Sequence, residues 1–248
     1  MLLQRGNQKL GPLIYNFSLP AFETCPGCTA ACAAVCYARD GFYTIPSTKT
    51  SLWKNYEASM KRTFAHEVIA QIRKQKARLV RIHPAGDFYS NDYIKKWQYI
   101  AKRCGGTTFY VYTRAWRSKR LLQQLEKLAR MHNVVMWWSA DCETDLHNGE
   151  PPKVEGVRVA YMQMHDDDFV PEYTDLVFRV KRDTVRKFVQ GRLVCPVENG
   201  YTGWVHKMTC SDCKICYRTK SVPTRDRDYT GPQEKVLAND SLDTGRPV

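Results

Sequence analysis

Two groups of cysteines carry the clearest chemical signal in the sequence. In the later group, Cys210, Cys213 and Cys216 follow one another with two residues between neighbours, and Cys195 lies upstream of them. Short loops of this kind turn thiolates toward a common centre, and four cysteines with such a tight core favour a 4Fe–4S cluster. Structural zinc, which usually draws on two separated pairs, is the alternative metal, and unligated thiols are the third reading.

The earlier group has four thiols in residues 25–36, separated mainly by small residues that let the loop fold tightly: Cys25, Cys28, Cys32 and Cys36. A second 4Fe–4S cluster suits this group as well. If three of the four cysteines bind, one iron stays open for a further ligand. If all four bind, the cluster only transfers electrons, and the spacing leaves both possibilities open. Cys104 and Cys142 stand alone, and we expect structural roles for them, with a role as a further ligand as the alternative for Cys142.

Strand-like and helix-like stretches alternate along most of the chain. Strands are expected at residues 13–18, 79–83, 109–112, 134–138, 157–162 and 176–180, and helices at 51–74, 90–104 and 118–128. This alternation is typical of βα units with a parallel sheet, and about six strands suit a partial, open βα barrel rather than a closed one.

We therefore expect an α/β fold with three parts. A partial barrel with its N-terminal cysteine loop would span residues 1–190, and a cysteine-rich cluster-binding segment would span 191–222. Residues 223–248 are polar and poor in apolar side chains, which predicts a tail on the surface.

Polar residues follow the expected strands and would gather at the carboxyl edge of a parallel sheet, where barrel enzymes bind small molecules. The candidate catalytic residues are His83, Asp87, Arg114 and His165, and the candidate cofactor-binding residues are Gly86, Asp87 and Ser139. Gly86 would permit close approach of a ligand to the backbone, and the neighbouring carboxylate could hold an ammonium group. A buried structural role is the alternative for each histidine.

The positive charge is concentrated in one half of the chain. The 248 residues have a formal net charge of +13, and residues 1–124 hold 20 basic and 6 acidic side chains. This imbalance favours a polyanionic partner, nucleic acid or a nucleotide, with general solubility as the alternative. The basic run from Arg114 to Arg120 lies at the expected start of a helix, where an anion would offset it, and Trp116 could stack on a base.

The distribution of apolar residues also predicts the cellular compartment of the protein. No run of 18 apolar residues is present, so we expect no membrane partner, and the N-terminus lacks the apolar segment of a signal peptide. We therefore expect a cytoplasmic protein. In a reducing compartment, clustered thiols indicate metal binding rather than disulfides.

Several stretches resemble the bacteriophage gene product 88 family: Tyr15–Pro20, Cys25–Gly27, Cys36–Ala38, Ile82–Ser90, Tyr112–Arg114 and the later cysteines. The resemblance implies a phage origin, hence the host cytoplasm, and matches the first family cysteines to Cys25, Cys32 and Cys36. It leaves Cys28 outside the family set.

A cysteine loop after the first strand, followed by a later cysteine set, is also similar to the radical S-adenosylmethionine (SAM) superfamily with an auxiliary cluster. The loop of that superfamily reads CxxxCxxC, whereas Cys28, Cys32 and Cys36 are spaced by one residue more. The resemblance implies that Asp87, in the place of a GGE-like segment, receives the ammonium group of SAM and that Arg114 receives an anionic group. SAM and an electron donor would then be needed.

Three hypotheses follow. The first is a radical-SAM-like iron–sulfur redox enzyme, an oxidoreductase or transferase acting on an anionic or nucleotide-type substrate, with 4Fe–4S clusters in both cysteine sets. The second is a non-catalytic iron–sulfur protein that binds nucleic acid, with the clusters as structural or redox-sensing elements. The third is a zinc-stapled nucleic-acid-binding module.

Overall fold

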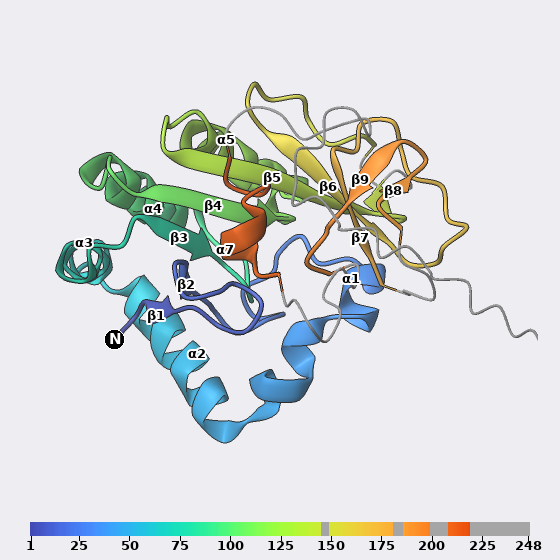
Figure 1. The fold of residues 1–248 in the computed structure, drawn as a ribbon. Coiled ribbons are helices and arrows are strands. Elements are labelled where there is room, and N and C mark those ends of the chain that lie inside the picture. Colours follow the sequence, from blue (N-terminus) through green and yellow to red (C-terminus); the bar gives the residue numbers. More distant parts are fainter. Residues whose placement is uncertain (145–148, 181–185, 199–207, 219–248) are drawn as a thin grey trace, which may run out of the picture.

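An open sheet of nine strands is the frame of the protein (Figure 1). The computed structural model describes residues 1–144, 149–180, 186–198 and 208–218. The strand order is β1-β2-β3-β4-β5-β6-β7-β9-β8, and only the two outermost strands run antiparallel to their neighbours. The strands are β1 (Gln4–Arg5), β2 (Tyr15–Phe17), β3 (Leu79–Ile82), β4 (Thr108–Thr113), β5 (Val134–Asp141), β6 (Arg158–Gln163), β7 (Leu176–Arg179), β8 (Phe188–Val189) and β9 (Arg192–Val194).

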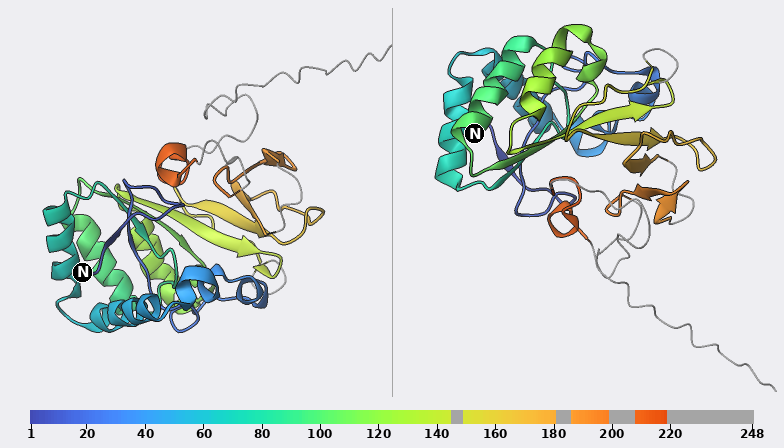
Figure 2. Two further views of the ribbon diagram at one scale, coloured as in Figure 1. Left: turned by 60° about the horizontal axis from the view of Figure 1, so that its bottom comes forward. Right: turned by 90° about the horizontal axis from the view of Figure 1, so that it is seen from above.

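The helices are distributed unequally over the two faces of this sheet. Three long helices cover one face, which we call the helix face, and α7 lies on the opposite face, which we call the α7 face (Figure 2). The α-helices are α1 (Ala30–Ala34), α2 (Pro46–Met60), α3 (Phe64–Gln75), α4 (Asn91–Arg103), α5 (Lys119–Ala129) and α7 (Cys210–Cys213), and the 3₁₀ helices are η1 (Tyr37–Arg39), η2 (Gly41–Thr44) and η3 (Ala115–Arg117).

The larger core lies between the helix face and helices α3, α4 and α5. Alternate residues of each strand point to this side, so Val80 and Ile82 of β3 are buried against the helices. Helix α4 begins at Ser90, whose hydroxyl accepts a hydrogen bond from the Tyr93 amide at 3.2 Å. Trp97 of the same helix is fully buried among aromatic rings, which fixes α4 against the sheet.

A smaller apolar cluster covers the α7 face. The intervening strand residues Tyr110 and Trp137 point to this side, where they meet Leu10, Ile14 and the α7 segment. The chain therefore brings residues 10–14 and 208–217 together on one face of the sheet, although they come from opposite ends of the described chain.

The α/β class and the open, mostly parallel sheet are confirmed, and each of the six expected strands overlaps an observed one. The expected single helix over 51–74 is wrong, because Lys61 ends α2 with extended backbone and α3 begins at Phe64. Apolar residues spaced by four drift by roughly 40° per step around an α-helix, so one straight helix cannot bury them all. Met60, which lies at the break, is 53% exposed.

The segment expected to bind a cluster, 191–222, contributes β9 to the same sheet as the N-terminal strands. The short strands β1, β8 and β9 had no clear sequence signal. The expected tail at 223–248 lies outside the described residues. Among the helices of the described ranges, none has the length and apolar character needed to cross a membrane.

Candidate metal centres

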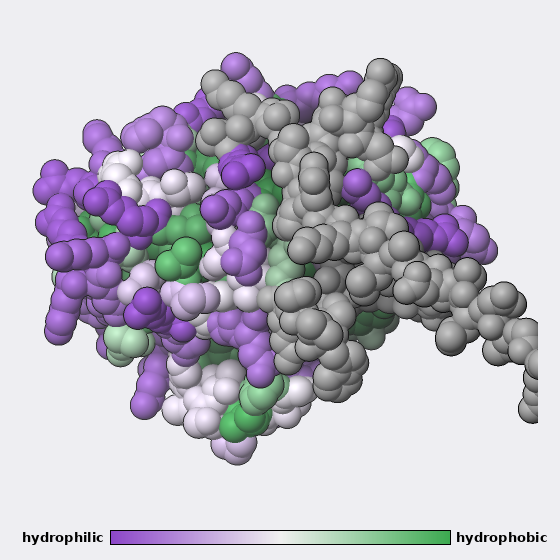
Figure 3. All heavy atoms as spheres, viewed as in Figure 1, coloured by the Kyte–Doolittle hydropathy of each residue, from purple (hydrophilic) through white to green (hydrophobic). Residues whose placement is uncertain are grey.

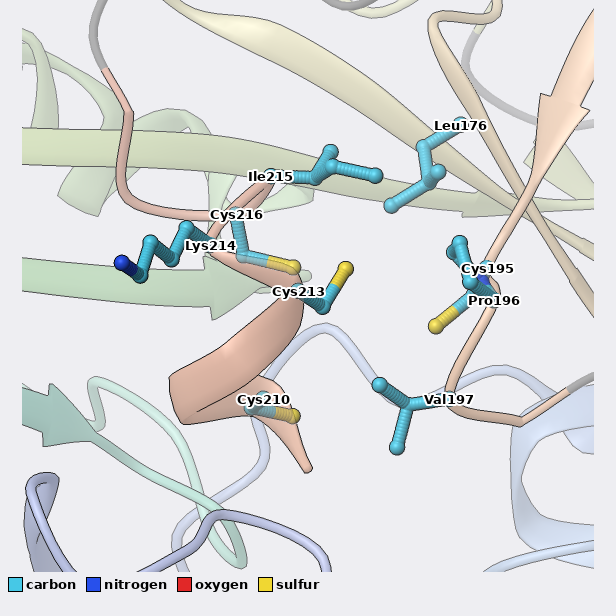
Figure 4. A pocket seen from close by; sticks show the side chains of 9 residues that line it. All are labelled: Leu176, Cys195, Pro196, Val197, Cys210, Cys213, Lys214, Ile215 and Cys216. Atoms are coloured by element: carbon cyan, nitrogen blue, oxygen red, sulfur yellow. The ribbon is translucent and has the colours of Figure 1, made fainter. Parts of the chain in front are cut away.

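The four later cysteines line a single cavity on the α7 face. Cys195 directly follows β9, Cys210 and Cys213 begin and end α7, and Cys216 lies in the turn after it. Figure 4 shows the four sulfur atoms pointing into the space between these segments, while Lys214 points away. The cavity measures about 10 Å³, the space of about one water molecule. The topology therefore gathers the thiols of the later set, as their spacing predicts.

Short polar contacts hold α7 in this place. Thr209 and Asp212 form a capping box at its start, and the Cys210 amide donates to the Lys9 carbonyl at 2.8 Å. Lys214 ends the helix in the left-handed conformation, at φ 63°, which turns the chain back toward the sheet. The Trp137 indole then donates to the Cys216 carbonyl at 2.9 Å. The cysteines are thus attached to both the N-terminal segment and strand β5.

The thiols of this set are costly to ionise without a cation. Burial, with some effect from neighbouring cysteines, raises the pKa of Cys213 to about 12 and raises the pKa values of Cys210 and Cys216. Because metal ligation requires thiolates, a bound cation would supply the charge that offsets this cost.

Polar side chains of strands β3 and β4 lie near the cysteines of the later set. The Tyr112 hydroxyl lies beside Cys216, and its oxygen is buried without a hydrogen-bond partner in the described structure. The Arg81 Nε and the Tyr110 hydroxyl oxygen are buried without a hydrogen-bond partner in the described structure, and both groups lie within electrostatic range of Cys210. Buried polar groups of this kind normally have partners, so these two indicate an acceptor next to the thiols.

No set of three His, Cys, Asp or Glu side chains in the described ranges lies close enough together to hold one metal ion.

The four earlier cysteines lie in the loop after β2, at the carboxyl edge of the sheet (Figure 1). Burial is the main cause that raises the pKa of Cys25 to about 12 and that of Cys28 to about 11, and it also raises the pKa of Cys36. Cys32 is near all three of these thiols and shares a side-chain hydrogen bond with Cys28. The loop thus brings its four sulfurs into one neighbourhood.

Acidic groups at the end of β5 fix this loop over the sheet. The Thr29 hydroxyl caps α1 by accepting from the Cys32 amide and donates to the Asp141 carboxylate at 2.6 Å. The Glu143 carboxylate accepts hydrogen bonds from the amides of Ala30 and Ala31 at the start of α1. Thr29 and Glu143, which the sequence did not single out, thus position the earlier cysteines together with Asp141.

Gly27 lets the loop approach the turn after β4. A Cβ atom at Gly27 would lie 1.9 Å from the Arg114 carbonyl oxygen, which belongs to the backbone and cannot rotate away. We expect Gly27→Ala to lower the free energy of unfolding by about 1–3 kcal/mol, the usual range for overpacking, in a urea titration. Gly105→Ala is the matched control, because its Cβ atom would meet only His132, at 3.8 Å. Equal stability of the two variants would contradict this close contact.

Asp87 lies beside the earlier set with its carboxylate fully engaged. It accepts hydrogen bonds from the Thr113 hydroxyl at 2.5 Å and from the amides of Phe88, Arg114 and Ala115 at 2.7–3.1 Å. Burial raises its pKa to about 6 despite these bonds, and its charge raises the pKa of Cys25. In this arrangement Asp87 orders the turn after β4.

Gly86, which was predicted to let a ligand approach the backbone, packs instead against another part of the chain. It has φ 79°, and a Cβ atom there would lie 2.6 Å from both the Leu19 Cβ and the Thr24 Oγ1. It thereby packs the β3–α4 loop against the chain that leads into the earlier cysteines.

Arg114 is placed near the earlier thiols. It forms an ion pair with the buried Asp141 carboxylate, and its positive charge lowers the pKa of Cys28, against the larger effect of burial. Ser139 of β5 accepts a hydrogen bond from the Trp116 indole through its carbonyl at 3.0 Å. Trp116 is only 4% exposed, so it has no free face for a base, and the stacking expected from its sequence position is wrong.

The two histidines of the predicted site lie apart from the thiols. His83 has φ 56°, which turns its ring into the aromatic core, where its Nε2 pairs with the Tyr93 hydroxyl at 2.8 Å. Burial lowers its pKa to about 3. His165 is exposed after β6, and its amide donates to Asp168 at 2.8 Å. Arg114, Asp87 and Gly86 are therefore the predicted site residues that the fold gathers around the earlier cysteines.

Comparison with known proteins identifies the family of the chain and two curated relatives. Residues 1–219 match the family described as Gene product 88. The chain is similar to the "Gene 88 protein" of Mycobacterium phage L5, with 26% identity over 170 residues that cover 63% of this chain and 69% of that protein. The "Gene 88 protein" of Mycobacterium phage D29 has the same identity, covering 63% and 68%. No solved structure is significantly similar to the chain.

Proposed function

Because the chain belongs to the gene product 88 family, for which the comparisons give a phage origin and no activity, we propose from its own geometry that it is an iron–sulfur protein. In this proposal, Cys195, Cys210, Cys213 and Cys216 hold a 4Fe–4S cluster on the α7 face. The earlier loop holds a second cluster at the carboxyl edge of the sheet.

The observation that carries the proposal is the cavity of the later set. Four thiols from two separate segments point into it, and the adjacent Arg81 and Tyr110 have buried donors without partners. Both features fit a cluster, whose ligands are thiolates and whose sulfur atoms accept hydrogen bonds.

The spacing of the later cysteines also favours a cluster over a single zinc ion. Cys210, Cys213 and Cys216 follow one another with two residues between neighbours, which is typical of cluster ligands, whereas structural zinc usually draws its ligands from two separated pairs.

The earlier set supports a more specific role. An open sheet with α3, α4 and α5 on one face is compatible with a partial βα barrel, and the earlier cysteines lie at its carboxyl edge, where barrel enzymes have their sites. We assign ligand roles to Cys25, Cys32 and Cys36, with Cys28 beside them. A cluster held by these three cysteines would have one open iron and, once reduced, would supply an electron to a bound sulfonium such as SAM.

Asp87 and Asp141 position Arg114 at this edge of the sheet. Asp87 holds the turn that carries Arg114, and the ion pair with Asp141 aims the Arg114 side chain across the loop toward Cys28. An anionic substrate group would compete with Asp141 for this guanidinium. Arg114 therefore has the substrate-binding role in the proposal, and Asp87 has a positioning role.

The test is the electron paramagnetic resonance spectrum of the anaerobically purified full chain after reduction with dithionite. The proposal predicts a signal from a reduced cluster, whereas a silent protein would contradict it. Addition of SAM should then change the part of the signal that arises from the earlier set. An unchanged spectrum, with no 5′-deoxyadenosine formed, would exclude the SAM role and leave electron transfer as the function of both clusters.

A further inference from the structure

A groove on the surface flanks the earlier cysteine loop. It lies between the chain entering the loop, the chain leaving it, and the first half of α2, and its volume is about 370 Å³. Its lining includes Phe22, Arg39, Tyr43, Lys49 and Trp53. None of these residues belongs to the sites described above, and the volume falls in the range of ligand-binding pockets.

Two aromatic side chains of this lining are exposed to an unusual degree. Trp53 is 45% exposed and Phe22 is 41% exposed, and the Arg39 guanidinium lies over the Phe22 ring at 5.1 Å from its centroid. Phe22 has φ 70°, a left-handed conformation that a bulky side chain rarely adopts. Such strain at a bulky residue is typical of functional sites, and here it keeps an aromatic face available beside a cation.

The cations of the groove are not neutralised by ion pairs. In the described part of the chain, neither Arg39 nor Lys49 has an acidic side chain within ion-pair distance. Glu23 also lines the groove and is exposed. The groove belongs to the half of the chain that holds 20 basic and 6 acidic residues, so its surroundings favour an anion.

Further apolar side chains extend the surface beyond the groove. Phe42 is 74% exposed, Tyr37 is 55% exposed and Ile45 is 40% exposed, all within the segment that leads into α2. Figure 3 shows an apolar patch at the bottom of the view, where η2 and the start of α2 lie. These exposed side chains belong to the same segment as Arg39 and Tyr43 of the groove.

We propose that this groove binds single-stranded nucleic acid, with bases stacking on Trp53 and Phe22 and phosphates contacting Arg39 and Lys49. Sites of this class combine aromatic platforms with cations that follow the backbone. A duplex keeps its bases inside the stack, so it cannot use the aromatic faces. The proposal goes beyond the iron–sulfur function and does not depend on which metal the cysteines hold.

The experiment measures fluorescence anisotropy of a labelled single strand of about twelve nucleotides of mixed sequence, titrated with the anaerobically purified full chain. Trp53→Ala should weaken binding about ten-fold or more through loss of stacking, and Trp53→Phe should restore part of the affinity. Arg39→Gln should weaken binding and lower the salt slope by about one, as expected for one lost phosphate contact. Arg73→Gln, an exposed arginine of α3, is the control for loss of charge alone and should leave the salt slope unchanged.

Intrinsic fluorescence gives a second readout on the wild type. Trp53 is 45% exposed, so a stacked base should quench its emission, and this part of the quenching should be lost in Trp53→Phe. Wild-type affinity of the Trp53→Ala and Arg39→Gln variants would overturn the proposal. Equal weakening by Arg73→Gln, or equal affinity for a duplex or for a free mononucleotide, would overturn it as well.

Discussion

Replacing Asp141 by Asn is expected to lower the free energy of unfolding by about 3–5 kcal/mol, because it leaves a largely buried guanidinium without its counter-charge. The Asp141 side chain is fully buried and that of Arg114 is 12% exposed. The same carboxylate also accepts hydrogen bonds from the Thr29 hydroxyl and the Glu143 amide. A urea titration of the anaerobic protein measures this loss.

The matched control is Glu126→Gln, which removes a surface ion pair with Arg130, a residue whose side chain is 66% exposed. Pairs of this kind contribute at most about 1 kcal/mol, so this variant should be close to wild type. The double variant Asp141→Asn, Arg114→Met should regain part of the stability, since it removes both buried charges. If Asp141→Asn were as mild as Glu126→Gln, the pair would not anchor the cysteine loop.

Replacing Cys213 by Ser is expected to remove roughly half of the iron and sulfide and to release the α7 segment from the sheet. Where a metal centre orders a segment, its binding free energy is folding free energy, so its loss has a large effect. The segment has direct bonds to the sheet and to the N-terminal chain between β1 and β2, and its three cysteines line the thiol cavity. Iron analysis and limited proteolysis of the 208–218 segment measure the two effects.

Cys104→Ala is the control for this variant. Cys104 is also buried, 7% exposed, but it lies at the end of α4 and no other cysteine contributes to its raised pKa. Its replacement should leave iron, sulfide and the protease pattern unchanged. Loss of iron in Cys104→Ala, or retention of all the iron in Cys213→Ser, would contradict the assignment of ligands.

The local pattern of the sequence was sufficient to predict strands β2 to β7 and the two thiol groups, but not the short strands β1, β8 and β9. The alternation of side chains along β3 also predicts the direction of Arg81. Arg81 lies between Val80 and Ile82, which face the helices, so its side chain points to the opposite face of the sheet. The same alternation predicts the wrong direction for the His83 side chain, because the left-handed backbone at that residue turns the side chain to the helix face. Such a reversal depends on the following Pro84–Asp87 turn and not on residue spacing.

Long-range contacts could not be predicted in the same way. The Ser211 hydroxyl donates to the Leu10 carbonyl at 2.8 Å across almost the whole described chain, and no pattern near either residue indicates the other. Thr29 and Glu143 are ordinary polar residues in the sequence and acquire their role only when the loop meets the end of β5. Trp116 was misjudged because its burial depends on packing against β5.

The central claim is that both thiol groups hold iron–sulfur clusters, and the most direct test is the content of iron, acid-labile sulfide and zinc in the anaerobically purified full chain. The account predicts roughly eight iron and eight sulfide per chain, in a brown protein that contains little zinc. A colourless protein with stoichiometric zinc and no sulfide would contradict it.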